Sequence, residues 1–531
     1  MPVPDVFRDG MARGWKTHNG AALDQDLTLE ADVAIIGSGA GGGTTAEILS
    51  AAGYKVLLIE EGPLKTSSDF KLLEDEAYAS LYQEGIGRMS KDGAITILQG
   101  RAVGGTTLIN WTSSFRTPDP TLSHWASEYA VKGHSSAEMA PWFEKMEQRL
   151  GIAPWALPPN ANNDVIRKGC EELGYSWHVI PRNVRGWFNL GYCGMGCPVN
   201  AKQSMLVTTI PSTLEQGGEL LYLARAERLK FSGDTITSLE CVAMDARCVA
   251  PTGRKITVKA KHYVLAGGGI NSPALLMRSD APDPHSRLGK RTFLHLVNFS
   301  AGLFDEVINP FYGAPQSIYS DHFQWQDGTT GKMSYKLEAP PLHPALASTL
   351  FGGYGTQNAL DMSQLPKTHA MLALLRDGFH PDSQGGSVGL RGDGTPVLDY
   401  EVSPYAWDGL RRAFHSMAEI QFAAGAKSVK PLHHDARYVS TLAEARSLID
   451  GLNLELHRTC LGSAHVMGGC AMGEEPKNAV ADSLGRHHQL RNLSIHDGSL
   501  FPTSIGANPQ LSVYGLTAQL ATALAERLKT A

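Results

Sequence analysis

Three glycines between a predicted strand and a predicted helix constrain the fold of this 531-residue chain more than any other feature. Residues 32–36 form an apolar run typical of a buried strand, and residues 44–52 suit a helix. Residues 55–60 form a second apolar strand that ends in acid. Gly37, Gly39 and Gly42 lie at the first turn in the spacing G-x-G-x-x-G. Residues 32–63 are therefore predicted to form a β-α-β unit of a parallel sheet.

The glycine spacing favours a bound dinucleotide. The first glycine permits a tight turn, the second lets a pyrophosphate approach the backbone, and the third lets helix and strand pack closely. Glycine-rich turns are common, but here Glu60 ends the second strand, where an acid would bind ribose hydroxyls. Such an acid disfavours NADP and is compatible with NAD or FAD. The cofactor-binding residues predicted in this unit are Gly37, Ser38, Gly39, Ala40, Gly41, Gly42, Glu60 and Glu61.

A second strand, glycine turn and helix are predicted over residues 261–279, but this segment lacks another G-x-G-x-x-G. Only one dinucleotide site is therefore expected. Residues 286–454 differ in composition, with more aromatic residues, prolines and short candidate strands. They are predicted to form a β-rich second lobe that covers a substrate pocket, because pockets favour lobe boundaries. The chain then ends in an amphipathic helix that returns to the first lobe.

Charge and composition exclude several classes of partner. The formal net charge of -6 shows no basic excess, which argues against nucleic acid or an anionic membrane surface as the main partner. No apolar run is long enough to span a bilayer, and the first residues lack the features of a signal peptide, so a cytoplasmic protein is expected. Cys193 and Cys197 are the one close pair among seven cysteines. Without further ligands nearby they predict no metal site; a structural loop is favoured, with a redox or disulfide role as the alternative.

Five segments in register carry a resemblance to a known family. They are GSGAGGGTTAEIL with IEEGP (37–63), GRAVGGTTLINW (100–111), GGGINSPALL (267–276), HVMGGCAMG (465–473) and LSIHDGSLFPTSIGANPQLSV (493–513). With these segments the chain resembles the glucose-methanol-choline (GMC) oxidoreductases, which are FAD-dependent alcohol oxidases and dehydrogenases. The HVMGGC and GANPQ segments look most like the cholesterol oxidase and long-chain alcohol oxidase branches.

The resemblance implies an α/β fold, with a Rossmann-like FAD-binding domain and a second, β-rich α+β substrate-binding domain. The first domain would comprise residues 1–115, 200–285 and 455–531, and the second residues 116–199 and 286–454. Some relatives attach the flavin through a histidine where this chain has Gln99, so non-covalent FAD is expected. Gly468, Gly469 and Gly473 would let the HVMGGC segment pass close to the cofactor. Further residues implied to contact FAD are Arg101, Gly104, Gly105, Asn110, Ala226, Asp497, Gly498 and Pro509.

In the same family a histidine and a late histidine or asparagine face the flavin as a catalytic pair, which matches His465 and Asn508 here. His465, with an ordinary pKa near 6.5, would take the alcohol proton, so the rate of flavin reduction should rise with pH through one ionisation. Asn508 would hold the substrate oxygen. The expected reaction is oxidation of a hydrophobic primary alcohol, benzylic or long-chain, followed by reoxidation of the flavin by oxygen or a quinone-type acceptor. Alternatives are a sterol or secondary alcohol as substrate, a cyanohydrin lyase, and a flavoprotein without catalysis.

Overall fold

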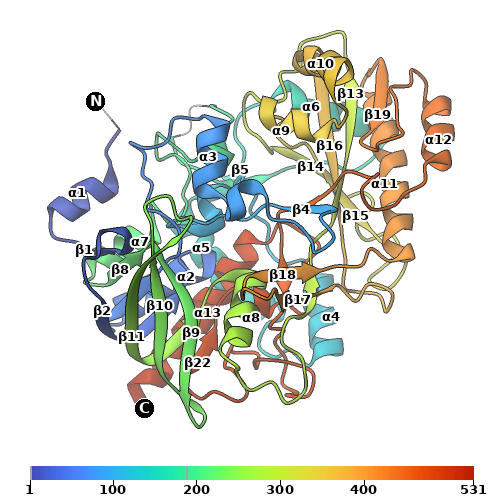
Figure 1. Ribbon diagram of the computed structural model, residues 1–531. Coiled ribbons are helices and arrows are strands. Elements are labelled where there is room, and N and C mark those ends of the chain that lie inside the picture. Colours follow the sequence, from blue (N-terminus) through green and yellow to red (C-terminus); the bar gives the residue numbers. More distant parts are fainter. Residues whose placement is uncertain (1–2, 187–188, 531) are drawn as a thin grey trace.

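Two β-sheets form the centres of two lobes in the computed structural model, which describes residues 3–186 and 189–530 (Figure 1). The first lobe is built on an eight-stranded sheet. Six of its strands are parallel, and β10 and β9 join as an antiparallel extension. Its strands are β1 (Lys16–Asn19), β8 (Glu219–Tyr222), β3 (Val56–Ile59), β2 (Leu27–Ile36), β11 (Pro251–Leu265), β10 (Thr235–Met244), β9 (Ala224–Ser232) and β22 (Leu493–Ile495).

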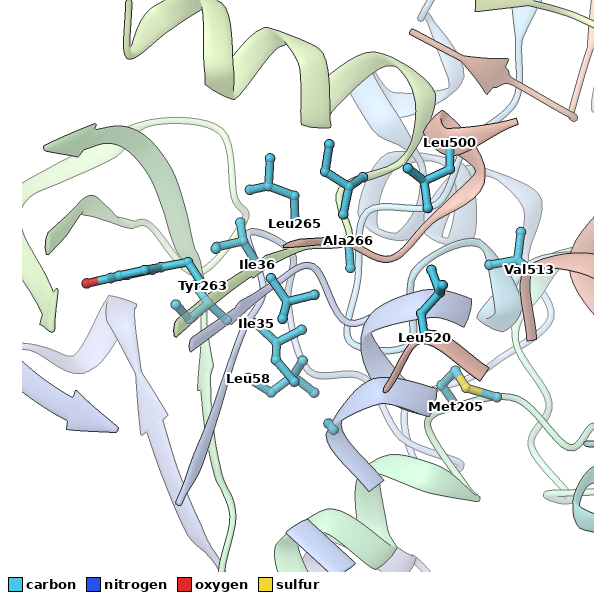
Figure 2. Packing of buried hydrophobic residues seen from close by; sticks show 14 of the residues in the cluster. Ile35, Ile36, Leu58, Met205, Tyr263, Leu265, Ala266, Leu500, Val513 and Leu520 are labelled. Carbon is cyan, nitrogen blue, oxygen red and sulfur yellow. The ribbon is translucent and has the colours of Figure 1, made fainter. Parts of the chain in front are cut away.

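The predicted β-α-β unit is confirmed as β2, the helix α2 (Ala40–Ala51) and β3. The first residues of β2 alternate between partly buried and exposed, whereas its last four residues and all of β3 are buried. A continuous apolar run of this kind is typical of a parallel strand covered on both faces. Side chains of Ile35, Leu58 and Leu265 from neighbouring strands share one core cluster with Leu520 (Figure 2).

Helix α13 (Gln510–Thr530) packs against α2 and so brings the end of the chain back to the first lobe, as the sequence predicts. Leu520 lies on this helix. No helix in residues 3–186 and 189–530 combines the length and apolarity needed to cross a bilayer. The other helices associated with this lobe are α1 (Val6–Ala12), α3 (Glu74–Leu81), α4 (Asp119–Tyr129), α5 (Ser136–Leu150), α7 (Thr209–Glu215) and α8 (Gly268–Arg278).

The second lobe is β-rich, in agreement with the predicted fold class. Its eight-stranded sheet is largely antiparallel, and α6 and α11 pack against it. The strands are β4 (Ile95–Ile97), β20 (Leu461–Ser463), β13 (Val297–Leu303), β16 (Thr368–Leu375), β15 (Tyr335–Glu338), β14 (Ile318–Ser320), β6 (His178–Val179) and β19 (Ser428–Pro431). The helices are α6 (Ala161–Leu173), α9 (Pro344–Leu350), α10 (Gly355–Ser363), α11 (Pro404–Ala423) and α12 (Leu442–Gly451).

Two smaller sheets complete the described structure. They contain β18 (Pro396–Asp399), β17 (Gly386–Leu390), β12 (Lys290–Phe293) and β21 (Met467–Gly468) in one, and β5 (Ile152–Pro154) and β7 (Pro181–Asn183) in the other. Some strands and helices pack in a different lobe from the predicted domain that contains their residues. β4 and β20 belong to the second sheet although they fall in ranges assigned to the first domain. Conversely, α5 packs against α13 and contributes to the first core.

Candidate active site

One cavity of about 730 Å³ runs from the glycine turn of the first lobe to the main sheet of the second. Most of the residues predicted from the sequence line it, although they come from distant parts of the chain. Gly42 and Gly104 lie behind its wall. The predicted residues that line the cavity are Gly37, Ser38, Gly39, Ala40, Gly41, Glu60, Glu61, Arg101, Gly105, Asn110, Ala226, His465, Asp497, Gly498, Asn508 and Pro509.

The turn after β2 requires glycine at both ends. Gly37 has φ +109°, and a β-carbon there would lie 2.3 Å from the carbonyl oxygen of Ala266. A β-carbon on Gly42 would lie 1.8 Å from the carbonyl oxygen of Gly37, so this glycine allows helix and strand to pack, as predicted. Helix α2 begins after Gly39 without a side-chain cap. Its first amide N–H groups are therefore available to an anion in the cavity.

Glu60 directly follows β3, and its hydrogen bonds hold the wall beside this turn in place. Its buried carboxylate accepts hydrogen bonds from the backbone N–H of Ser38 (3.1 Å), the hydroxyl of Ser38 (2.5 Å) and the backbone N–H of Gly62 (2.9 Å). Burial raises the pKa of the Glu60 carboxyl, and these hydrogen bonds oppose that rise. A carboxylate has about four acceptor positions, so one remains for a ligand hydroxyl. The geometry therefore fits the ribose contact predicted for Glu60.

The segment 100–110 lies across the same turn. The backbone N–H of Gly104 donates to the hydroxyl of Ser38 at 2.9 Å. Gly104 therefore supports the cavity wall from behind, through Ser38. The Asn110 side chain donates to Oε1 of Gln510 at the start of α13 (2.6 Å). Arg101 lies 3.9 Å from Glu61 as an ion pair. This segment therefore forms one long wall of the cavity.

Asp497 links the opposite wall to helix α8. Its carboxylate accepts from the backbone N–H of Gly268 (2.8 Å), the hydroxyl of Ser272 (2.6 Å) and the backbone N–H of Ser499 (2.8 Å). Ala226, on β9, is held from behind because Arg278 donates to its carbonyl oxygen at 3.0 Å. A diphosphate and a ribityl chain fit this combination of backbone N–H groups, glycines and polar side chains.

One expectation from the sequence needs correction, and a second needs a limit. Gly468, Gly469 and Gly473 do not line the cavity; Gly468 pairs with β12, and a β-carbon on it would lie 2.0 Å from the carbonyl oxygen of Arg291. Their lack of side chains serves packing against neighbouring backbone rather than approach to a cofactor. Cys193 and Cys197 are free thiols. Within the described ranges no group of three or more His, Cys, Asp or Glu side chains is arranged to hold a metal ion.

His465 lies on the cavity wall after β20, and its environment differs from the expected one. Nδ1 of its ring lies 3.0 Å from Nδ1 of His295, a buried residue that sequence reasoning missed. Burial, together with the nearby positive charge of Lys336, lowers the pKa of His465 to about 3. The expected ordinary pKa near 6.5 is therefore wrong for this environment. The ring is therefore neutral throughout the physiological pH range, and an unprotonated ring nitrogen is present to accept a proton.

Asn508 faces the same cavity from the loop before α13. Its amide oxygen accepts from Nζ of Lys336 (3.2 Å), and its amide nitrogen donates to Oε2 of Glu338 (3.1 Å). Both partners lie on β15, about 170 residues earlier in the chain. No local motif in the sequence points to them; because they are two residues apart on β15, both side chains lie on one face of the strand.

Comparisons with known proteins agree with this architecture. The chain matches two family models, each described as GMC oxidoreductase, over residues 78–297 and 381–517. It is 29% identical over 509 residues to a long-chain-alcohol oxidase of Arabidopsis thaliana, an alignment that covers 92% of this chain and 66% of that oxidase. It is 26% identical to a 6'''-hydroxyparomomycin C oxidase of Streptomyces lividus, with 94% of this chain and 92% of that oxidase covered.

Solved structures of similar fold include two oxidases. A pyridoxine 4-oxidase from Mesorbium loti has a TM-score of 0.66 at 19% sequence identity, with 92% of this chain and 98% of that chain covered. A formate oxidase from Aspergillus oryzae has a TM-score of 0.70 at 14% identity, with 96% of this chain and 100% of that chain covered. At these identities the two structures establish the shared fold.

Proposed function

Because the chain belongs to the GMC oxidoreductase family, we propose that it oxidises a hydrophobic primary alcohol, benzylic or long-chain, to the aldehyde. The observation that carries this proposal is the continuity of one cavity, which joins the glycine turn, His465, Asn508 and an apolar wall. FAD, predicted from the sequence, agrees with the family assignment. Its non-covalent attachment is inferred from Gln99, whose amide is not a nucleophile and accepts a hydrogen bond from Arg88 (3.0 Å).

The apolar wall comes from the second lobe. Val297 and Phe299 on β13 pair with Leu374 and Leu372 on β16 and line the cavity. These four residues, the apolar platform, give no hydrogen-bonding group to a substrate. Leu346 and Leu350 of α9 extend the same lining. An alkyl or aryl group would lose contact with water here, which favours hydrophobic alcohols over small polar ones.

In the proposed reaction His465 accepts the hydroxyl proton at Nε2 as hydride leaves the carbinol carbon. Its Nδ1 must then carry a hydrogen that is donated to Nδ1 of His295, and the 3.0 Å separation allows this bond. Asn508 donates a hydrogen bond to the substrate oxygen and holds it beside His465. FAD supplies the hydride acceptor when it is bound. Oxygen or a quinone-type compound is the proposed final acceptor.

Anaerobic addition of alcohols tests this function directly. We expect benzyl alcohol and long-chain primary alcohols to bleach the flavin of the yellow holoenzyme and to yield aldehyde. An unchanged spectrum with every alcohol, accompanied by release of aldehyde and cyanide from a cyanohydrin, would instead establish the lyase. Oxygen uptake after reduction separates an oxidase from a dehydrogenase.

The apolar platform predicts a dependence on chain length. Each buried CH₂ group contributes about 0.8 kcal/mol, so the second-order rate constant for flavin reduction should rise about fourfold per CH₂ in a series of primary alcohols. Phe299→Ala should weaken this rise for the longer alcohols and leave ethanol nearly unaffected, because ethanol is too short to use the platform. Stopped-flow reduction under argon measures both slopes. An equal loss of rate constant for short and long alcohols would show that the apolar platform does not contact the substrate.

The buried state of His465 predicts a flat pH profile. Because its pKa is lowered to about 3, the ring is already neutral at the acidic end of the usual range. The limiting rate of flavin reduction should change little between about pH 5 and pH 7, whereas a base with a pKa of 6.5 would give a rise of about 25-fold. Flavin content measured at each pH serves as the control. A rise of that size would show that His465 titrates as an ordinary histidine once the cofactor and substrate are bound.

A further inference from the structure

A buried ion pair lies directly behind Asn508. Lys336 and Glu338 are two residues apart on β15, so both side chains lie on one face of the strand. Nζ of Lys336 lies 3.0 Å from Oε1 of Glu338, and the side chains are only 1% and 0% exposed. Neither side chain lines the cavity itself. The charge of Lys336 acts on His465 from a distance, whereas both side chains contact one neighbour that lines the cavity.

That neighbour is the amide of Asn508, which the pair holds from both sides. An ammonium group only donates hydrogen bonds and a carboxylate only accepts them. Because Lys336 contacts the amide oxygen and Glu338 contacts the amide nitrogen, the amide has one possible orientation. One of its two N–H bonds is used by Glu338, which leaves the other for a group in the cavity. Asn508 is thus fixed as a hydrogen-bond donor toward the substrate.

Further contacts keep the pair itself in place. Gln316 donates to Oε2 of Glu338 at 2.6 Å, and its own amide oxygen accepts from the hydroxyl of Ser113 at 2.7 Å. Nζ of Lys336 lies 3.1 Å from the ring centroid of Phe115 and 4.2 Å from that of Tyr319. Burial lowers the pKa of Lys336 to about 8, and the contact with Glu338 opposes that fall.

Stability alone is a poor explanation for this arrangement. Removing two charges from water costs several kcal/mol per ion, and apolar residues of similar volume often give an equally stable protein. A pair that is costly to bury, and that is aimed at one active-site amide, is better explained by the orientation it imposes.

We propose that Lys336 and Glu338 are positioning residues that hold the amide of Asn508 as a donor to the alcohol oxygen. This inference rests on the proposed function. It goes beyond that function because it assigns to β15, a strand of the second lobe, the orientation of the group that holds the substrate hydroxyl. It also restricts the substrate to compounds that present an acceptor oxygen at this point.

The test uses the FAD-loaded full-length protein and two measurements. One is the limiting rate of flavin reduction by benzyl alcohol, normalised to bound flavin. The other is the dissociation constant of 2-phenylpropan-2-ol, read from the perturbed flavin spectrum. This tertiary alcohol has no hydrogen on its carbinol carbon, so it can bind but cannot be oxidised. Its binding therefore reports on the site without depending on turnover.

Lys336→Met is expected to lower the reduction rate by about 10- to 100-fold, because a misplacement of about 1 Å can cost that much. It should weaken binding of the tertiary alcohol by up to about tenfold, the value of one lost hydrogen bond. The double variant Lys336→Met/Glu338→Leu removes both charges and should recover thermal stability while keeping both defects. In an Asn508→Ala background, Lys336→Met should have little further effect on binding of the tertiary alcohol, because the pair contacts that alcohol only through the Asn508 amide.

A matched control comes from a second buried pair, Lys430 and Asp361, which lie 3.1 Å apart on β19 and α10 and outside the cavity. Lys430→Met/Asp361→Leu should change stability without changing the rate per flavin. A double variant at Lys336 and Glu338 with wild-type rate and binding would overturn the positioning role. Full additivity of Lys336→Met and Asn508→Ala in binding of the tertiary alcohol would overturn it as well. If the wild-type protein neither binds the tertiary alcohol nor is reduced by benzyl alcohol, the proposed function itself fails, which is a distinguishable result.

Discussion

His465→Ala is expected to fold and to retain FAD but to reduce its flavin about 10²- to 10⁴-fold more slowly than the wild type. The range is the usual contribution of a general base. His465 is the titratable side chain that combines a place on the cavity wall with a neutral ring throughout the physiological range. Its Nδ1 is occupied by His295, which leaves Nε2 for the substrate proton. Stopped-flow reduction by benzyl alcohol under argon, divided by the bound flavin, measures the loss.

His369 provides a matched control for this substitution. It is also a fully buried histidine whose pKa is lowered to about 3, but it contacts Gln421 and does not line the cavity. His369→Ala should therefore lose stability while its rate per bound flavin stays close to the wild-type value. If His465→Ala behaves in the same way as this control, His465 is a core histidine and its assignment as the base is wrong.

Glu60→Ala is expected to weaken FAD binding by about 100-fold and to leave the rate per bound flavin within about twofold. The substitution removes the proposed ribose contact together with the three hydrogen bonds that shape the wall beside the glycine turn. Hydrogen bonds to a charged group contribute about 1.5–3 kcal/mol each, so the loss of one or two accounts for the expected effect. Bound FAD is first removed by dialysis. Titration of the apoprotein with FAD, followed by absorbance and fluorescence, then gives the dissociation constant.

Glu60→Gln tests the negative charge of Glu60 separately from the size and shape of its side chain. It keeps an acceptor oxygen but places an amide nitrogen against N–H donors, so its affinity should lie between those of the wild type and Glu60→Ala. Glu219, another buried acid in the same sheet, contacts His18 at 2.9 Å and lies outside the cavity. Glu219→Ala should reduce stability without a specific loss of FAD. Unchanged flavin affinity in Glu60→Ala would show that the Glu60 carboxylate stabilises the glycine turn and does not contact FAD.

Local sequence determined the cofactor-binding unit because its signals act over a few residues. A glycine at position 37 is required by a positive φ and by the carbonyl oxygen of Ala266, and the apolar runs on either side are buried as the pattern predicts. His465 and Asn508 came instead from the resemblance to a family. The residues around them gave no independent reason to single them out, because a histidine among small apolar residues has the same local pattern whether it is catalytic or structural.

Tertiary structure alone decided the electrostatics and the anchoring of the active site. The pKa of His465 depends on burial and on Lys336, and the orientation of Asn508 depends on a strand about 170 residues earlier in the chain. The apolar platform likewise needs β13 and β16 to pair in one register. No periodicity within a segment encodes such contacts, because they arise only when two sheets close around one cavity. Resemblance to a family therefore indicated which side chains could do the chemistry, whereas packing determined their protonation and orientation.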